Sequence, residues 1–475
     1  MILDSISVMG APRSSSSSGI GRRRGQSTNN KSNLISIIVV GLSFTFTLLL
    51  MLFIHYASSS GNDSVSGDGI EVKKNNPYQQ QINERLKGEE ETAKHFGKWA
   101  GIINGELHLV DINARSIKQG NKVYSDSKYQ GVTGRFCKLD WDKYKKDPPS
   151  YPMFRILVSE SGCDKEKNII SLDLASVIHK AREYDKSIEH RQTHNDNDVH
   201  VMPPSGFVFH ESRVGSTLVA NSLTAMNPSG HRVYSESHPI NNALKACKES
   251  GCNMDTNADL LRDVVYLMGR TRVPTEKHMF FKVSSAGSKN INVMRKAFPQ
   301  VPWIFVFRDP VQTMMSHLDP EKLKTVRGGT PKAVCLRGKQ QPPSDLVNLV
   351  SDMGSSVKSL TYEEYCAAHL ATLCTSALKQ MKETDSKGVA VEYDNLIDKL
   401  ISKIIPDHFN IPIDDDAKER IQVVGGTYSK SKGGDNKVWK EDSKAKDERS
   451  TPQIRSASDK FLSSSYTELK KYTIV

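Results

Sequence analysis

Two stretches of this 475-residue sequence decide its fold, GFVFHESRVGSTL at residues 206–218 and VPWIFVFRDP at residues 301–310. Each begins with a continuous apolar run, which is typical of a strand buried on both faces of a parallel sheet. Each run ends in a polar turn, and a helical pattern follows it, over residues 216–226 in the first case. This alternation predicts an α/β fold with three layers, a parallel sheet covered by helices on both faces.

Further segments extend this pattern on both sides of the second stretch. A helix is expected over residues 288–298, and strands are expected in HRVYSES (231–237), HMFFKVS (278–284) and VAVEYDNL (389–396). Because the carboxyl ends of parallel strands meet at one edge, where open α/β folds bind ligands, polar residues that follow these strands are the candidates for a site.

The turn after the first strand has the composition of an anion-binding loop. Gly215 permits a tight turn, and Ser216 and Thr217 open the following helix, whose free N–H groups favour negative charge. Arg213 adds a fixed cation. A Ser/Gly turn that only caps a helix would look the same. The Walker A motif is excluded, because it requires lysine where Ser216 stands.

The second stretch ends in Arg308, followed by Asp309 as a helix cap and Pro310 in the first turn. Ser316 lies eight residues after Arg308, two turns along the same helix. Arg308 and Ser316 are therefore expected to hold a second phosphate, although an isolated R-D-P tripeptide is more often a capped helix with a surface arginine.

The two segments lie about 90 residues apart, and together they resemble the sulfotransferase family. A strand, a basic-x-G-[ST]-[ST] turn and a helix bind the phosphosulfate there, and R-D-P with a serine eight residues after the arginine binds the 3′-phosphate. The form S-R-x-G-S-T-L is closest to the carbohydrate and bacterial-like branch, with Val214 as a departure from the usual small residue. The resemblance covers roughly residues 203–475 and includes the V-E-Y-D-N-L segment.

The resemblance implies a sulfotransferase that uses 3′-phosphoadenosine 5′-phosphosulfate (PAPS) as cosubstrate and needs no metal. Catalytic roles fall to Glu236 as the favoured base, to His238 as the second candidate and to Arg213, with Lys282 and Ser284 as lesser candidates. Lys432, in a Lys/Gly-rich loop, is expected to cover the nucleotide. The residues expected to bind PAPS are Arg213, Val214, Gly215, Ser216, Thr217, Leu218, Arg308, Ser316 and Lys432.

Three other functions fit parts of the sequence. A P-loop kinase-like enzyme is one alternative, but the sequence lacks the lysine of that loop and has no clear magnesium-binding acid beyond Asp309. A glycosyltransferase would need D-x-D, which occurs only in the polar segments 195–198 and 414–416. An inactive, sulfotransferase-like protein that binds glycans is disfavoured, because Arg213, Ser216, Arg308 and Ser316 are all present.

The amino-terminal part has the layout of a type II membrane protein. Residues 34–54 form 21 consecutive uncharged positions, which as a helix would span roughly 30 Å. Basic residues precede this segment, so the tail is expected in the cytosol and the rest in the lumen. A cleaved signal peptide is the alternative. The expected parts are a cytosolic tail (1–33), a signal-anchor (34–54), a stem (55–95), a small mixed α+β region (96–200) and the sulfotransferase domain (201–475).

Composition and cysteines complete these expectations. The layout indicates a Golgi glycoprotein, with one usable sequon at Asn62, and the net charge of +11 suits a polyanionic glycan or protein acceptor, with no nucleic acid expected. The seven cysteines allow up to three disulfides, with Cys247–Cys252 the most plausible local bridge. No zinc spacing connects cysteines with histidines, so no metal is expected.

Overall fold

In the computed structural model the chain divides after Ile82, and all described residues belong to the second unit, Asn83–Val475. The tail, the signal-anchor and the stem predicted from the sequence all lie outside the described residues. None of the helices in the described part is both long and apolar enough to cross a membrane. The structure describes residues 97, 99–120, 128–189, 198–320, 323, 332–427 and 442–474.

A five-stranded parallel sheet forms the centre of the second unit, in the order β12-β11-β7-β10-β8. β7 lies in the middle, and the chain adds β8 and β10 on one side of it before β11 and β12 on the other. The carboxyl end of β7 is therefore the point where the strand order switches, which is where such sheets bind ligands. The strands are β7 (Pro204–His210), β8 (His231–Ser235), β10 (His278–Lys282), β11 (Trp303–Phe307) and β12 (Gly388–Glu392).

Alternate residues of the central strands enter two separate apolar cores. In β7, Phe207 and Phe209 join one core while Val208 joins the other, and in β11 Phe305 and Val306 divide in the same way. All of these side chains are almost completely buried. Since successive residues of a strand point to opposite faces, the sheet is covered on both sides, as predicted.

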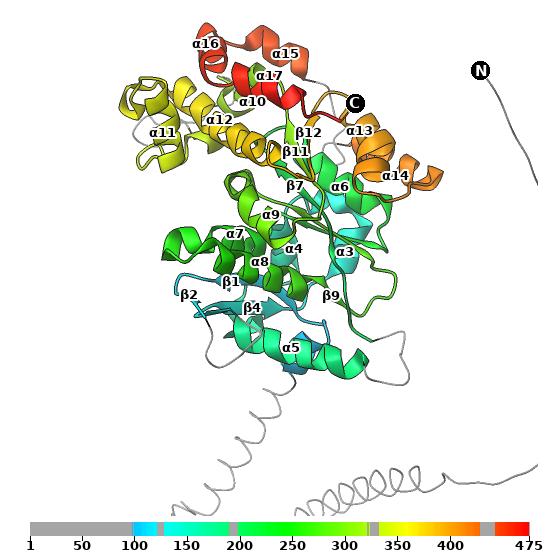
Figure 1. Ribbon diagram of the computed structural model, residues 1–475. Helices are drawn as coiled ribbons and strands as arrows, with labels where there is room; N and C mark the ends of the chain where they lie inside the picture. The colour runs from blue at the N-terminus through cyan, green and yellow to red at the C-terminus, as the bar shows by residue number, and fades with distance from the viewer. Residues whose placement is uncertain are drawn as a thin grey trace, which may run out of the picture. The chain divides into compact units, whose positions relative to one another are not determined.

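Two sets of helices provide these covers, as Figure 1 shows. The helix α6 (Ser216–Met226), which follows β7, packs against α14 on one face, and its bounds match the sequence prediction. The other helical segments are α7 (His238–Ser250), α8 (Met254–Gly269), η3 (Ser285–Asn290), α9 (Ile291–Ala297), α10 (Pro310–Leu318), η4 (Val334–Leu336), α11 (Ser344–Asp352), η5 (Val357–Ser359), α12 (Tyr362–Met381), α13 (Leu396–Lys399), η6 (Leu400–His408), α14 (Asp415–Gly425), α15 (Ser443–Arg449), α16 (Pro452–Phe461) and α17 (Ser463–Lys470).

Residues before the parallel sheet form a small antiparallel sheet of order β1-β4-β5, which packs against α7 and α8 (Figure 1). The helix α5 follows the last strand of this small sheet. The elements are β1 (His108–Asn113), β2 (Lys118–Gln119), β3 (Tyr129–Gln130), β4 (Thr133–Cys137), α3 (Trp141–Lys146), η1 (Pro148–Ser150), α4 (Phe154–Glu160), η2 (Glu166–Asn168), β5 (Ile170–Asp173), α5 (Leu174–Glu189), and the short pair β6 (His200–Val201) and β9 (Arg270–Thr271).

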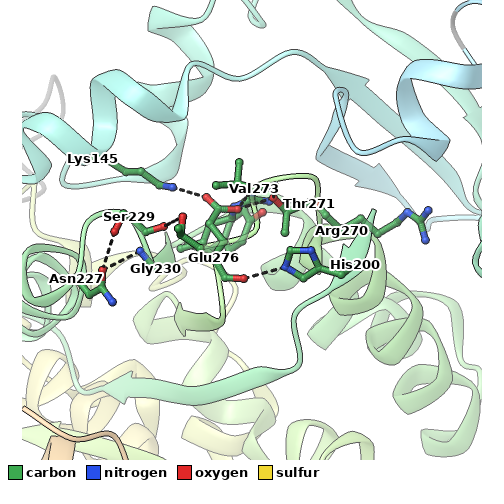
Figure 2. Close-up of polar contacts among 12 residues, drawn as sticks. Lys145, His200, Asn227, Ser229, Gly230, Arg270, Thr271, Val273 and Glu276 are labelled. Atoms are coloured by element: carbon green, nitrogen blue, oxygen red, sulfur yellow. Dashed lines mark hydrogen bonds and ion pairs between the residues drawn. The ribbon is translucent and has the colours of Figure 1, made fainter. Parts of the chain in front are cut away.

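A buried ion-pair cluster joins this region to the amino ends of β8 and β10. The Glu276 carboxylate accepts hydrogen bonds from Lys145 and Arg232. The Thr271 hydroxyl also donates to it, at 2.7 Å. Figure 2 shows Lys145 and His200 reaching Glu276 from two sides, with His200 on its backbone carbonyl. Because the first cation comes from α3 and the second from β8, the cluster fastens the preceding region to the sheet.

Three disulfides add covalent links, Cys137–Cys163, Cys247–Cys252 and Cys335–Cys366. The short bridge expected from the sequence, Cys247–Cys252, is confirmed. Cys374 on α12 is buried and free.

Candidate active site

The loop between β7 and α6 has an unusual backbone. Ser212, Arg213 and Gly215 all have positive φ angles, of 91°, 62° and 83°. Such angles are common for glycine but costly for Ser and Arg, at roughly 1–3 kcal/mol each. A side chain at Gly215 is excluded for a second reason, because a Cβ there would lie 2.7 Å from the ring of Tyr393.

This conformation leaves a row of amide donors open. Within the described part of the chain, no acceptor is recorded for the N–H groups of residues 213–217, and α6 has no side-chain cap. Backbone N–H groups that converge in a left-handed turn at a helix N-terminus form an anion-binding nest. Arg213 is exposed beside them, whereas Val214, Ser216 and Thr217 are buried and Leu218 is half-buried. The loop therefore has the donors and the charge that a phosphate needs.

Glu211, at the start of the same loop, connects it to the second predicted segment. Its buried carboxylate accepts from the backbone N–H of Arg308 at 3.0 Å, from the Thr313 hydroxyl at 3.1 Å and from the Cys374 thiol at 3.1 Å. Burial raises the pKa of Glu211 to about 7, although these hydrogen bonds act to lower it. One carboxylate thus fixes the spacing between the two candidate phosphate-binding segments.

Tyr393 connects the two segments from the other side. Its ring packs against Gly215, and the Arg308 guanidinium lies over it, 4.1 Å from the ring centre. Its backbone N–H donates to Phe307 at 2.9 Å, directly before Arg308. Tyr393 is the tyrosine of the V-E-Y-D-N-L segment, so the element that closes the sheet also shapes the site.

Arg308 leaves the carboxyl end of β11 as predicted, and its side chain is only 4% exposed. Its guanidinium donates to Gln312 at 2.8 Å, to Ser443 at 2.7 Å and to Asp442 at 3.1 Å. Asp309 caps α10 through the Gln312 N–H at 3.0 Å, and Pro310 lies in the first turn, both as expected. A buried guanidinium that faces a carboxylate and a hydroxyl is suited to an anion with several oxygens.

Ser316 lies on α10, and its expected role at a phosphate stays a prediction. Its hydroxyl donates to the Gln312 carbonyl, one turn earlier in α10, at 2.9 Å. Local bonds of this kind compete with longer-range contacts of serine in a helix. The structure therefore brings Arg308 together with Ser443 and Asp442, while the recorded bond of Ser316 stays within its own helix.

The strands on the other side of β7 place a second charged group at the same edge. Glu236 follows β8, and its carboxylate pairs with Lys282, the last residue of β10. Lys282 is completely buried whereas Glu236 is 20% exposed. Burial lowers the pKa of Lys282, even though the carboxylate favours its charged form.

His210, the last residue of β7, completes this cluster. Its Nε2 lies 3.8 Å from the Glu236 carboxylate, and its Nδ1 accepts the Ser212 N–H at 3.0 Å. Because Nδ1 accepts, the neutral ring carries its proton on Nε2, toward Glu236. The cluster of His210, Glu236 and Lys282 thus adjoins the anion-binding loop through consecutive residues of the chain.

The remaining predicted residues are placed as follows. His238 is exposed at the first position of α7. The Ser284 hydroxyl donates to Asn241 at 2.8 Å. Lys432 lies outside the described residues. Within the described ranges, no cluster of His, Cys, Asp or Glu has the arrangement of a metal site.

Backbone strain identifies the same residues independently. In the described part of the chain, six non-glycine residues have positive φ, and Asp385, Asn395 and Asn410 are of the types that tolerate it. The other three are Ser212, Arg213 and Glu236, all at this edge of the sheet. Strain in intolerant residue types gathers at functional sites, so this distribution supports the assignment of Arg213 and Glu236.

Sequence reasoning missed the roles of Glu211, His210 and Tyr393. The first two stand beside the predicted loop, and their position at the end of a buried strand was the available signal. The Arg308 backbone that Glu211 binds lies 97 residues further along the chain, and the Glu236 carboxylate beside His210 follows β8, two strands away in the sheet. No local pattern in the sequence indicates either contact.

Compared by sequence, the chain matches no family profile and no curated protein. Compared by structure, it is similar to solved sulfotransferase domains. The domain from the olefin synthase of Synechococcus PCC 7002 is 12% identical, with 59% of this chain and 98% of that domain covered and a TM-score of 0.28. For the sulfotransferase STF9 of Mycobacterium avium the identity is 10%, the coverage 52% and 72%, and the TM-score 0.31. At these identities the likeness concerns the fold alone.

Proposed function

We propose that this protein is a PAPS-dependent sulfotransferase that transfers a sulfuryl group to a hydroxyl or amine of a glycan or protein. The observation that carries the proposal is the shared edge of the sheet. There, the strained loop with open N–H groups adjoins a carboxylate that is partly exposed and paired with a buried lysine.

The donor set fits a nucleotide with two separated phosphate groups. The 5′-phosphosulfate would lie on the N–H groups of residues 213–217, with Arg213 beside them. The 3′-phosphate would lie at Arg308. The guanidinium now donates to the Asp442 carboxylate and the Ser443 hydroxyl, and phosphate oxygens would accept the same kind of hydrogen bonds. Glu211 and Tyr393 hold the two segments at a fixed separation. A nucleotide that lacks the 3′-phosphate would therefore bind at only one of the two phosphate sites.

The transfer needs a base for the acceptor and positive charge for the group that moves. Glu236 accepts the proton of the acceptor hydroxyl while the new oxygen–sulfur bond forms and the bond from sulfur to the phosphate oxygen breaks. Adenosine 3′,5′-bisphosphate leaves with the electron pair of that bond. Lys282 and Arg213 stabilise the negative charge on the sulfuryl and leaving oxygens, and His210 orients the carboxylate.

The location of the protein is also part of the proposal. A single-pass, type II Golgi membrane protein, anchored in the bilayer through residues 34–54, would expose the sheet domain to the lumen. Three disulfides in the described part support an oxidising compartment, where such bridges form and persist.

The activity is tested by incubating the full chain with PAPS labelled with sulfur-35 and a panel of glycans and peptides. We expect covalent label on an acceptor, and a fall of about 100-fold for Arg213→Ala, because one preorganised donor to a developing charge has this magnitude. Arg115→Ala, which removes an exposed arginine after β1, is the matched control and should keep the wild-type rate. Absence of label on every acceptor, or wild-type labelling by Arg213→Ala, would contradict the proposal.

A further inference from the structure

The segment α3–η1–α4 runs along β8, which is an edge strand of the parallel sheet. The Tyr144 hydroxyl bonds that of Thr224 in α6 at 2.8 Å, and the ring of Trp141 lies 5.1 Å from that of Tyr234 in β8. The Ser235 hydroxyl then donates to the Pro152 carbonyl at 2.8 Å. The segment therefore covers the open edge and brings the start of α4 to the carboxyl end of β8, beside Glu236.

Arg155, the second residue of α4, is the charged group that this placement delivers. It is exposed, and no ion pair or hydrogen bond of its guanidinium is recorded in the part of the chain that the structure describes. Its charge nevertheless acts on Lys282, whose pKa is lowered first by burial and further by Arg155. Arg155, for which the described residues record no counter-charge, thus lies within electrostatic reach of the proposed catalytic pair.

The start of α7 lies at the same place, and its first side chains also have no recorded hydrogen-bond partner among the described residues. Ser237 is the N-cap but makes no capping bond, and its hydroxyl is buried without a partner among the described residues. His238 follows it and is exposed. The hydrogen bond between Ser235 and Pro152 joins the chain before α7 to the chain before α4. His238 lies three residues after Ser235, and Arg155 lies three residues after Pro152.

We propose that Arg155 and the N-terminal turn of α7 bind an anionic group of the acceptor, a carboxylate or sulfate near the hydroxyl that receives the sulfuryl group. This rests on the proposed function, because Glu236 marks where that hydroxyl lies. The net charge of +11 favours a polyanionic acceptor, so the fitting class is a uronic-acid polysaccharide. The region before the parallel sheet would thereby select the acceptor, whereas the loop and Arg308 select the nucleotide.

The test compares unsulfated chondroitin, which carries a carboxylate in each repeat, with its carboxyl-reduced form. Binding of both to the full chain is measured by calorimetry, with adenosine 3′,5′-bisphosphate present, and sulfur-35 transfer to both is measured in parallel. We expect wild type to bind chondroitin about 10- to 100-fold more tightly, the range for a hydrogen bond to a charged group. Arg155→Ala should lose this preference, Arg155→Lys should keep part of it, and Arg115→Ala should keep all of it.

Equal binding of the two polysaccharides by wild type, or an undiminished preference in Arg155→Ala, would overturn the anion site. Transfer at equal rates to a tyrosine peptide without acidic neighbours would also count against it. The two proposals fail separately. Binding that depends on Arg155, without any transfer, would support the anion site and contradict the proposed activity. Transfer that does not depend on Arg155 would support the activity and contradict the anion site. Thermal unfolding of each variant checks that it is folded.

Discussion

The strands β8 and β10 carry a glutamate cluster at each of their ends, and the two glutamates differ in how far they are exposed to solvent. At the amino ends, Glu276 is 1% exposed and holds Arg232, Lys145 and Thr271. At the carboxyl ends, Glu236 is 20% exposed and its recorded cation is Lys282. The same chemical group, on the same two strands, is closed to solvent in one place and accessible in the other.

This difference indicates a structural role for the Glu276 cluster and a candidate site at Glu236. Burial acts to raise the pKa of Glu276, but the charges of Arg232 and Lys145 outweigh it and hold the pKa below its usual value. That carboxylate is fixed in its charged form and has no room for a ligand. Glu236, by contrast, has a strained backbone with φ of 53° and an exposed surface. Its carboxylate is accessible to a group that enters from solvent.

The substitution Glu236→Gln should have the largest effect on activity. The amide cannot accept a proton, so we expect the rate of sulfuryl transfer to fall by about 10²- to 10⁴-fold, as is common when a general base is removed. The melting temperature should fall less than for the corresponding change at Glu276, because one cation, Lys282, loses its counter-charge here and two lose theirs at Glu276. Transfer at the wild-type rate would show that another group, with His238 as the first candidate, removes the proton.

Glu276→Gln should produce the opposite pattern. It leaves Arg232 and Lys145 without their counter-charge in a buried cluster, which costs about 3–5 kcal/mol of unfolding free energy. Chemical denaturation measures this, with Glu166→Gln as the control, since its pair with Arg135 is at the surface and contributes little. An unchanged stability for Glu276→Gln would mean that the amino-end cluster does not fasten the preceding region to the sheet.

Glu211 extends the comparison to a buried carboxylate whose recorded partners include no cation. Its pKa is raised from 4.5 to about 7, so the folded state binds the proton more tightly than the unfolded state. The unfolding free energy should therefore decrease as the pH rises from about 4.5 to 7, by about 3 kcal/mol at most. In Glu211→Gln this contribution is absent, so denaturation curves at pH 5 and pH 8 should differ less than in wild type. Equal pH dependence of the two proteins would contradict the assignment.

Much of the fold could be predicted from local patterns. The apolar runs ending at His210 and Phe307 form the central strands β7 and β11, and the helix after Gly215 has the bounds expected for it. These features depend on residues that are close together in the sequence, so local patterns predict them. The contribution of residues 99–189 could not be foreseen, because its contacts with β8 and α6 join residues about 80 positions apart.

The site was predicted in part. Arg213, Gly215, Arg308 and Glu236 lie at one edge as expected, because carboxyl ends of parallel strands coincide. The pairing of Arg308 with Asp442 spans 134 residues and follows from the tertiary fold alone. The shared phosphate that the spacing of Arg308 and Ser316 predicts stays a prediction, since the recorded bond of the Ser316 hydroxyl is to the Gln312 carbonyl.

The most direct test of the account is the affinity of the full chain for adenosine 3′,5′-bisphosphate and for AMP, measured by calorimetry. The account predicts that the bisphosphate binds about 10- to 100-fold more tightly, because Arg308 holds the additional phosphate through charged hydrogen bonds. Arg308→Ala should abolish this preference while Arg115→Ala keeps it. Equal affinity of the wild-type protein for the two nucleotides, or no binding of either, would contradict the claim that this edge of the sheet binds PAPS.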